Sequence, residues 1–414
     1  MALKLKSMGN KIGRGALASV VSVAMGLGMT ACTKTYSVGF IYVTTGKATA
    51  GLINAYKVDY QTGTLNALTD SPIPSGGRYP IGLVADPKQH KFLYVIHNDD
   101  SNVVLFDIGT DGKLYPAATY DIPGSFPTAV AVDSTDSFLY VAFTYQQGYT
   151  PALQGPGGVA IFPITTTGTD PDVLTQTLGT PTVVNVGRSP AGITITSNGA
   201  YVIEQDAATN LNLLAFARNS TTGALTLLPG QTINAGNTAS FGLASGVTPS
   251  AITANSAGTN LYVTDQGGDQ LLSYSIGSTG LPTALGSVVT GSLPVGLGID
   301  VTGTFLYVTD YNDGAVNGYT FGASGQPVVS TVAQHVQTGT GPTCVATIGA
   351  PGYTDASHAL YLYTSNALGN NVTGEQVNTQ TGPLAGQLAQ LINSPYTASA
   401  LPTCLVSVPW VPRS

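Results

Sequence analysis

A short pattern recurs seven times along the chain, at a spacing typical of repeat proteins. It is a proline, any residue, a small residue and an aliphatic residue, and its prolines are Pro80, Pro127, Pro190, Pro249, Pro294, Pro342 and Pro402. A second anchor is a Tyr flanked by apolar residues, at Tyr42, Tyr94, Tyr140, Tyr201, Tyr262, Tyr307 and, more loosely, Tyr361. Consecutive Tyr anchors lie 45 to 61 residues apart. Periods of this length indicate a fold built from stacked units or from the blades of a ring.

Each repeat is predicted to hold four short antiparallel strands. Strand-like runs such as 103–106 and 213–216 lie between the anchors, and Thr-Gly-x-Leu turns follow, as at 62–65 and 222–225. Gly in these turns supplies the positive φ angle that tight hairpins need. The small residue after each proline suits the innermost strand of a blade, where seven strands crowd toward one axis. The sequence therefore predicts an all-β, seven-bladed β-propeller, with a solenoid as the structural alternative.

The two anchors are out of phase at the ends of the repeat region. Tyr42 has no proline pattern before it, and Pro402 has no Tyr anchor after it. The strand from 402 to 408 is therefore predicted to complete the blade begun by residues 39–68, so that N- and C-terminal strands close the ring in one sheet. On this basis residues 39–414 form a single propeller domain.

Composition excludes several classes of protein. Only 8% of the residues are charged and 43% are hydrophobic, so neither disorder nor a mainly helical fold is expected. With 21 acidic residues against 14 basic ones, the chain lacks the basic surface that captures nucleic acid. The sequence has no phosphate loop and no His-Glu-x-x-His or Cys-x-x-Cys motif, and turns explain acidic pairs such as Asp310 and Asp313. We therefore expect neither a cofactor nor a metal.

The first 31 residues have the features of a targeting segment. Four basic residues precede an apolar run from 16 to 29, which is too short to span a bilayer. The run ends in Met29-Thr30-Ala31-Cys32, which resembles the lipobox of bacterial lipoproteins, with Met in place of the usual Leu. The resemblance implies a signal peptide over 1–31, a lipid on Cys32, a tether over 32–38 and an extracytoplasmic place at the outer membrane, because Thr33 rather than Asp follows. An ordinary cleaved signal is the alternative.

The repeats resemble those of a known enzyme family. The segments 261–265 and 306–310 both read Leu-Tyr-Val-Thr-Asp, which resembles the YVTN repeat. The chain from residue 39 onward is similar to the seven-bladed lactonases, a group that includes 6-phosphogluconolactonase-like and cyclic-ester-forming propellers. This resemblance implies hydrolysis of a sugar lactone or another cyclic ester without a metal, although repeats specify architecture better than chemistry.

Candidate catalytic residues lie where the predicted Tyr strands end. The position three residues after each Tyr holds Thr45, His97, Phe143, Glu204, Asp265, Asp310 and Thr364. Arg78 and Arg188 each stand two residues before a proline anchor, at the same end of the predicted blades. A lactone hydrolase needs a base to activate water and a cation to stabilise the oxyanion. His97 or Glu204 is the predicted base, and Arg188 or Arg78 the predicted stabiliser.

The family pattern is incomplete in this chain. Family lactonases carry Pro-Arg-His at the inner strand and Asn-Glu after the Tyr strand. Here no proline anchor is followed by Arg-His, and His97-Asn98 and Glu204-Gln205 are the nearest matches to Asn-Glu. This departure favours a ligand-binding or scaffold module at the cell envelope over catalysis, with the metal-independent lactonase as the alternative.

Two insertions are candidate ligand-binding segments. Residues 144–158 carry Tyr145 and Tyr149, and residues 229–248 carry Phe241, in each case among small polar residues. Long loops on a rigid scaffold commonly bind partners. Asp265 and Asp310 are further candidate ligand contacts, although closing turns is the plainer role for both. The expected partners are a small molecule, a carbohydrate or an envelope protein, with the membrane reached through Cys32, and a monomer is expected.

Two cysteines remain after Cys32. Cys344 and Cys404 occupy the same repeat position on the last two inner strands. An oxidising compartment permits a disulfide between them. The alternative is that both are simply small residues, as Gly and Ala are in the other five repeats.

Overall fold

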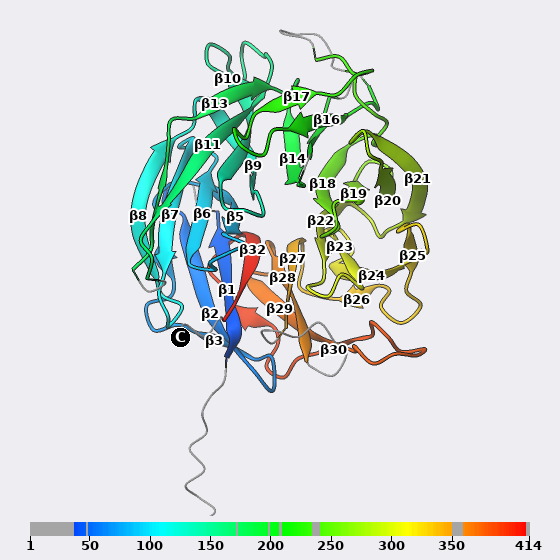
Figure 1. Ribbon diagram of the computed structural model, residues 1–414. Helices are drawn as coiled ribbons and strands as arrows, with labels where there is room; N and C mark the ends of the chain where they lie inside the picture. The colour runs from blue at the N-terminus through cyan, green and yellow to red at the C-terminus, as the bar shows by residue number, and fades with distance from the viewer. Residues whose placement is uncertain are drawn as a thin grey trace, which may run out of the picture. The chain divides into compact units, whose positions relative to one another are not determined.

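Each proline anchor lies in the inner strand of a separate antiparallel sheet in the computed structural model, and in six of the seven it is the first residue of that strand (Figure 1). The structure describes residues 37–46, 49–170, 173–197, 199–206, 209–233, 241–349 and 359–410. The predicted signal peptide, Cys32 and most of the predicted tether lie outside these residues. The first strand begins at Ser37, two residues before the predicted start of the propeller. Within the described part of the chain, no helix has the length and apolar character that a membrane span requires.

The seven sheets are the predicted four-stranded blades. The inner strands are β5 (Pro80–Ala85), β9 (Gly124–Val132), β14 (Pro190–Ile195), β18 (Pro249–Ala254), β22 (Pro294–Ile299), β27 (Pro342–Gly349) and β32 (Pro402–Pro409). The second strands, in the same blade order, are β6 (Phe92–His97), β10 (Phe138–Gln146), β15 (Gly199–Glu204), β19 (Asn260–Asp265), β23 (Leu306–Asp310), β28 (Leu360–Asn366) and β1 (Ser37–Thr45).

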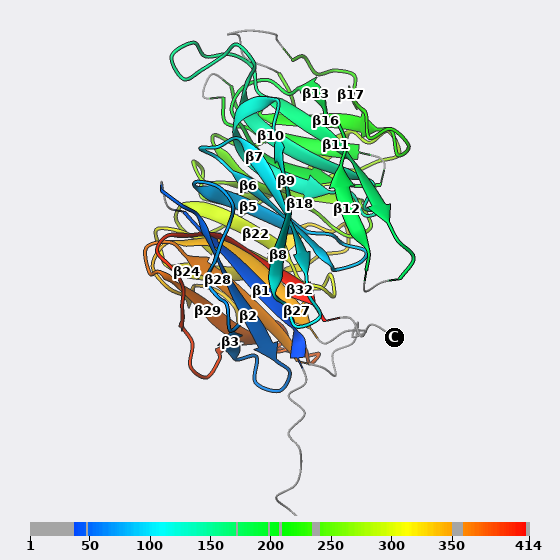
Figure 2. The ribbon, with the colours of Figure 1, turned by 90° about the vertical axis from the view of Figure 1, so that its left-hand side faces the viewer.

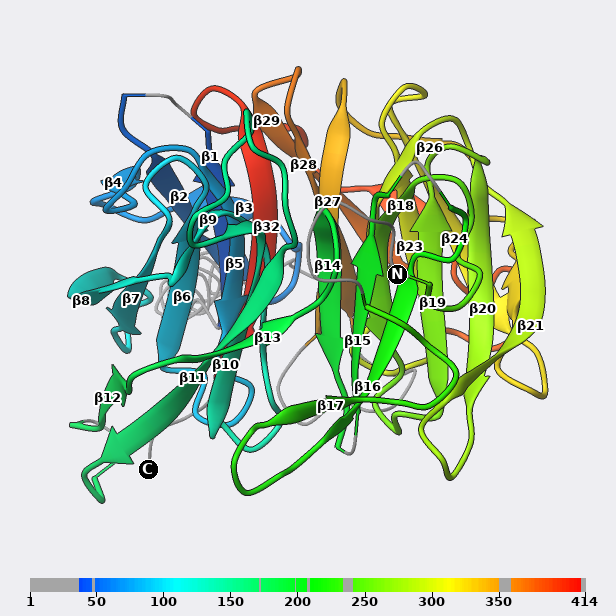
Figure 3. The same cartoon turned by 90° about the horizontal axis from the view of Figure 1, so that it is seen from above.

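The third and outermost strands complete each blade. The third strands are β7 (Asn102–Ile108), β11 (Gly158–Thr167), β16 (Leu213–Arg218), β20 (Gln270–Ile276), β24 (Ala315–Phe321), β29 (Asn371–Val377) and β2 (Leu52–Asp59). The outermost are β8 (Leu114–Asp121), β12 (Thr175–Leu178), β17 (Leu225–Leu227), β21 (Pro282–Val289), β25 (Pro327–Val329), β30 (Leu388–Gln390) and β3 (Leu65–Ala67). Four further short strands pair with third strands: β4 (Ile73–Pro74), β13 (Thr182–Asn185), β26 (Val336–Gln337) and β31 (Tyr396–Thr397). Figure 3 shows β19, β20 and β21 of one blade side by side.

The ring closes through the strands at its two ends, as predicted. β1 pairs with β32 from Gly39 opposite Pro409 to Thr45 opposite Pro402, and the two lie side by side in Figures 1 and 2. Each inner strand contacts the next in the order β32, β5, β9, β14, β18, β22 and β27, and β27 returns to β32. This circular order confirms the propeller and excludes the solenoid.

The Tyr anchors join neighbouring blades. Their rings are almost completely buried, and their hydroxyls reach across to the next blade, except that of Tyr307, which has no hydrogen-bond partner among the described residues. Tyr42, Tyr140, Tyr201 and Tyr262 each donate to the carbonyl of a Gly in a hairpin turn of that blade. Those glycines have positive φ angles, as predicted for these turns. The buried Tyr therefore combines apolar packing with one satisfied polar contact between blades.

The anchor of the seventh Tyr strand is Tyr363, not Tyr361. In the other six blades the anchor Tyr pairs with the residue four after the proline, as Tyr94 pairs with Val84. In β28 the residue at that register is Tyr363, opposite Ala346, and its hydroxyl donates to Gly63. The position three residues further on is therefore Asn366, and the prediction of Thr364 is wrong by two residues.

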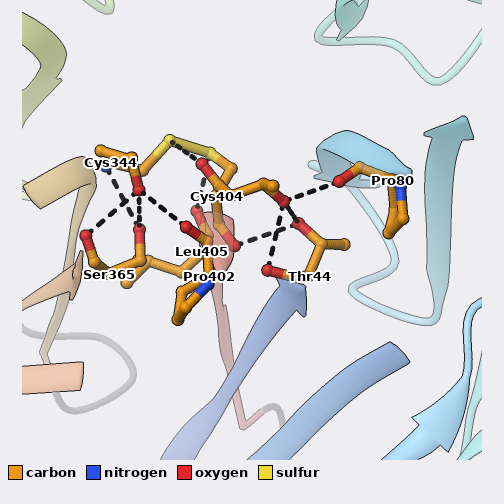
Figure 4. The surroundings of a disulfide bond; sticks show 9 residues. Thr44, Pro80, Cys344, Ser365, Pro402, Cys404 and Leu405 are labelled. Atoms are coloured by element: carbon orange, nitrogen blue, oxygen red, sulfur yellow. Dashed lines mark hydrogen bonds between the residues drawn. A yellow bond between two sulfur atoms is a disulfide. The ribbon is translucent and has the colours of Figure 1, made fainter. Parts of the chain in front are cut away.

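Cys344 and Cys404 form a disulfide between β27 and β32 (Figure 4). Their Cα atoms lie 5.0 Å apart, because the small residues of adjacent inner strands crowd together near the axis. Beside the bond, Thr403 donates a hydrogen bond of 2.7 Å to the carbonyl of Pro80 in the next blade. The closing strand is thus linked to the blades on both of its sides.

Candidate functional site

The inner strands begin, and the second strands end, at the same end of the propeller. We call this end the proline rim, and define it by the segments before the inner strands and the turns after the second strands. The segments are 77–80, 124–127, 187–190, 246–249, 291–294, 339–342 and 399–402. In each blade, the proline of the inner strand pairs with the ring residue of the second strand, as Pro80 does with His97 and Pro190 with Glu204. The rim therefore brings the predicted arginines and the predicted bases together.

The ring residues lie beneath the rim and not on it. All seven side chains are 0% or 1% exposed: Thr45, His97, Phe143, Glu204, Asp265, Asp310 and Asn366. In six of the seven segments the residue three before the proline is Gly. In five of these segments a Cβ on that Gly would lie less than 3.0 Å from the ring side chain. A Cβ on Gly77 would lie 2.6 Å from the His97 ring, and one on Gly246 would lie 2.2 Å from the Asp265 carboxylate. This Gly-x-x-Pro spacing is visible in the sequence and would have predicted the burial.

Glu204 and Arg188 form one compact unit of the rim. The backbone N–H of Arg188 donates to Glu204 Oε2 at 3.0 Å, whereas Oε1 has no hydrogen-bond partner. Burial raises the pKa of Glu204 to about 8, against the opposing effects of the Arg188 N–H and guanidinium. The guanidinium is partly exposed and donates to Gln154 Oε1 at 3.0 Å. The carboxyl group is therefore mostly protonated at neutral pH, and the nearby cation is not neutralised by it.

His97 and Arg78 form a second unit with different chemistry. His97 Nε2 lies 2.9 Å from Ser75 Oγ, and burial lowers the pKa of the imidazole to about 4. Arg78 contacts Asp100 through its guanidinium at 2.6 Å and through its backbone N–H. The imidazole is thus neutral and enclosed at pH 7, and the cation is already paired with a carboxylate. No hydrogen bond or ion pair among the described residues joins this unit to Glu204 and Arg188.

The two candidate aspartates serve the protein itself in this structure. Asp265 accepts hydrogen bonds from the backbone of Val247, Thr248 and Gly267 and from Gln270, so that it fixes the rim segment above it. Asp310 accepts one from Asn317, and burial raises the pKa of its carboxyl to about 7. These contacts hold the turns that follow the second strands.

The aromatic residues of the two insertions lie in different places. The ring of Tyr145 meets that of Phe126 edge to face, 6.0 Å between centroids, on the proline rim. Tyr149 packs against Gly155 of its own loop. Phe241 is exposed and pairs through its backbone with Thr232, beside the beginning of β16. Residues 234–240 of the second insertion lie outside the described residues. Only Tyr145 joins the rim segments directly.

One feature of the rim is not predicted by the sequence. The residue before the proline has a positive φ angle in six of the seven segments, and in four of these it is large and apolar: Tyr79, Phe126, Leu293 and Leu401. Bulky residues rarely adopt this conformation. Such residues carry no sequence signal of their own, whereas Gly at that position would have been recognisable.

The described cavities lie at the opposite end of the propeller. One of about 440 Å³ is lined by Lys88, Gln89 and Asp136 among others, and one of about 170 Å³ by His90 and Trp410 among others. Neither includes a residue of the proline rim. No cluster of three or more His, Cys, Asp or Glu side chains suited to a metal occurs within the described ranges.

Residues 40–180 and 231–349 match the family described as "Lactonase, 7-bladed beta-propeller". The chain belongs to this lactonase family. The matched segments cover more than half of this lactonase-family chain, and they include Arg78 and the segment around Phe126. They do not include residues 181–230, which contain Arg188 and Glu204. No curated protein matches the sequence.

Solved structures of similar fold cover almost the whole chain. A putative 6-phosphogluconolactonase from Bacteroides fragilis is 17% identical, with a TM-score of 0.67, over 91% of this chain and 99% of that one. The periplasmic gluconolactonase of Pseudomonas aeruginosa is 16% identical, with a TM-score of 0.66, over 90% and 99%. At these identities the likeness shows the fold alone, and this lactonase-family propeller shares it from end to end.

Proposed function

We propose that the protein is a metal-independent lactone hydrolase that works at the proline rim, close to Arg188. Family membership favours this activity over the binding or scaffold role that the incomplete motifs suggested. Two similar folds are described as lactonases of sugar acids, which suggests a lactone as the substrate class here. The observation that carries the proposal is the Arg188 guanidinium. Of the two arginines on the described part of the rim, Arg78 is paired with Asp100, whereas Arg188 has no carboxylate within ion-pair distance.

Lactone hydrolysis proceeds by attack of water on the ring carbonyl. The carbonyl oxygen gains negative charge, the ring C–O bond then breaks, and the leaving oxygen takes up the proton that water releases. A guanidinium facing the carbonyl stabilises the oxyanion more strongly than it stabilises the neutral ester. Arg188 is suited to this task because it is partly exposed and held in place by Gln154.

Glu204 is assigned as a positioning residue, since its side chain is 1% exposed and does not reach the rim surface. Its carboxyl group fixes the backbone of Arg188 by the 3.0 Å hydrogen bond. While protonated it leaves the positive charge of Arg188 undiminished, and ionisation above about pH 8 places a negative charge beside the guanidinium. The rate is therefore expected to fall above that pH.

The test is hydrolysis of a panel of neutral and phosphorylated lactones, followed by variants. Arg188→Ala is expected to lower kcat/KM about 10²–10³-fold. Glu204→Gln keeps the hydrogen-bond acceptor, so it is expected to retain most of the rate but to lose the decline above about pH 8. Lys113→Ala, at the opposite end of the propeller in an ion pair with Asp70, is the control. If Arg78→Ala rather than Arg188→Ala removes activity, the site is at His97 and Arg78. If the protein opens no lactone, the catalytic proposal fails.

We further propose that the protein acts outside the cytoplasm, anchored by a lipid on Cys32. The support is the lipobox-like sequence 29–32 after a basic and then apolar segment, together with the periplasmic description of one protein of similar fold. Cys32→Ser is expected to release the protein from the membrane fraction or to leave it unprocessed. A variant that remains as firmly membrane-bound as the parent would contradict lipid anchoring.

A further inference from the structure

Large apolar residues stand before the prolines on one part of the proline rim. Leu293, Leu401, Tyr79 and Phe126 belong to the inner-strand segments of β22, β32, β5 and β9. In the one intervening segment, before β27, the residue is Gly341, and a Cβ there would lie 3.0 Å from Leu368 and 3.1 Å from Tyr311. Apolar side chains thus occupy the rim over five consecutive blades. We call Leu293, Tyr311, Leu368, Leu401, Tyr79, Phe126 and Tyr145 the apolar arc.

The arc is exposed at the cost of backbone strain. Leu401 and Tyr79 are 44% and 40% exposed, and Leu368 is 56% exposed. The φ angles of the four residues before the prolines lie between 51° and 58°. A residue with a side chain is strained in this conformation, whereas Gly is not. Because this strain holds large apolar side chains on the rim rather than in the core, it points to a ligand.

Specific hydrogen bonds hold the strained backbone in place. The N–H of Leu293 donates to Asp269 of the preceding blade, and that of Leu401 donates to Asn370, both at 2.8 Å. Their carbonyls accept from the turns after the second strands, at Tyr311 and Gly46. The arc is therefore a preorganised surface, which binds a ligand with little further loss of conformational freedom.

Charge on the rim limits what the arc can bind. Among the described residues, Arg78 and Arg188 are the cations of the rim, and Arg78 is paired. The turns of the rim also carry acidic residues, among them Asp99, Asp100, Asp269 and Asp313. A phosphate dianion needs a cluster of Arg or Lys donors, and the described part of this surface instead repels it.

We propose that the apolar arc binds the hydrophobic substituent of an uncharged lactone, while Arg188 faces the lactone carbonyl. The two features adjoin, because β9, which carries Phe126, contacts β14, which follows Arg188. The occupant is thus an alkyl- or aryl-substituted lactone rather than a phosphorylated sugar lactone. This inference rests on the proposed hydrolase function for the orientation of the ring, but the apolar contact stands on its own geometry.

The experiment compares hydrolysis of δ-valerolactone, δ-decalactone and 6-phosphogluconolactone. Burial of each added methylene is worth about fourfold in kcat/KM, so δ-decalactone is expected to exceed δ-valerolactone by at least about tenfold. The phosphorylated lactone is expected to be the poorest substrate. Leu401→Ala and Phe126→Ala are expected to lower the decalactone-to-valerolactone ratio about fivefold each. Leu384→Ala removes an equally exposed Leu (52%) at the opposite end and is the matched control, with an unchanged ratio.

A binding measurement separates failure of the arc from failure of the catalytic proposal. Isothermal titration calorimetry with δ-decalactone, carried out in the slow Arg188→Ala background, is expected to show saturable binding that weakens when Leu401→Ala is added but not when Leu384→Ala is added. Saturable binding without turnover would support the arc and contradict the hydrolase. Turnover with a ratio near one, unchanged by the arc variants, would support the hydrolase and overturn the arc. Preference for the phosphorylated lactone, or no binding by any probe, would also overturn it.

Discussion

Replacement of Glu204 by Gln is expected to stabilise the protein at neutral and alkaline pH. Burial raises the pKa of Glu204 from its ordinary 4.5 to about 8, so the folded state holds this proton more tightly than the unfolded state does. The stability that the protonated carboxyl contributes is complete below about pH 4.5 and is lost as the pH rises through about 8. The pKa of Glu204 is about three and a half units higher in the folded state than in the unfolded state. Relative to low pH, this difference lowers the free energy of unfolding by about 3 kcal/mol at pH 7 and by about 5 kcal/mol above pH 9.

The assay is equilibrium unfolding in urea of parent and variant at a series of pH values. Gln does not ionise and keeps an acceptor for the Arg188 N–H, so the variant is expected to lack this part of the pH dependence. The difference in free energy of unfolding between Glu204→Gln and the parent should grow by about 3 kcal/mol from about pH 5 to about pH 8. Asp99→Asn, which removes an exposed carboxylate of the same rim, controls for net charge. A difference that does not change with pH would refute the raised pKa and, with it, the pH profile proposed for catalysis.

Three other predictions concern the ring itself. Cys404→Ser removes a disulfide that closes a 60-residue loop, so a loss of about 4 kcal/mol in the free energy of unfolding is expected, and chemical reduction of the parent should reproduce it. Gly246→Ala should cost several kcal/mol more than Gly230→Ala, because the two have φ angles of 87° and 85° but only the first would overlap a buried carboxylate; equal melting temperatures would contradict this. Deletion of 402–414 should lower the free energy of unfolding by about 4 kcal/mol or more from its buried aliphatic residues alone. Deletion of the loop 147–155, whose flanking residues are hydrogen-bonded to each other, should lower the free energy of unfolding much less, and equal losses for the two deletions would contradict closure of the ring by β32.

The sequence predicts the ring well because its signal is repeated. Seven proline anchors with small residues two positions later agree on one inner strand, and the unpaired anchors at the two ends specify which blade is shared. The register error at Tyr361 shows the limit of this reasoning. Side chains two residues apart point to the same face of a strand, so Tyr361 and Tyr363 both satisfy an alternating pattern. Only the strand pairing opposite Ala346 distinguishes them.

The sequence predicts which candidate residues lie near one another, but it does not predict that their side chains are buried. The spacing from Tyr and Pro anchors correctly brings Glu204 to Arg188 and His97 to the Arg78 segment. The burial of these side chains depends on the backbone that crosses above them, and thus on the Gly that stands three residues before the proline in six of the seven segments. The apolar arc could not be predicted, because a positive φ angle at Leu401 or Phe126 arises from hydrogen bonds to other blades and leaves no trace in local sequence.

The bond between Cys344 and Cys404 also determines how copies of the protein can interact. The closing strand β32 is a terminal element that pairs with β1, and such elements are the ones that two copies exchange in domain swapping. Because the disulfide ties β32 to β27 of the same chain, exchange of that strand alone is covalently prevented. A swapped dimer of the oxidised protein would have to transfer the entire sheet of β27 to β30 as well. Once the intrachain disulfide has formed, each chain is therefore committed to close its own ring, whatever its local concentration.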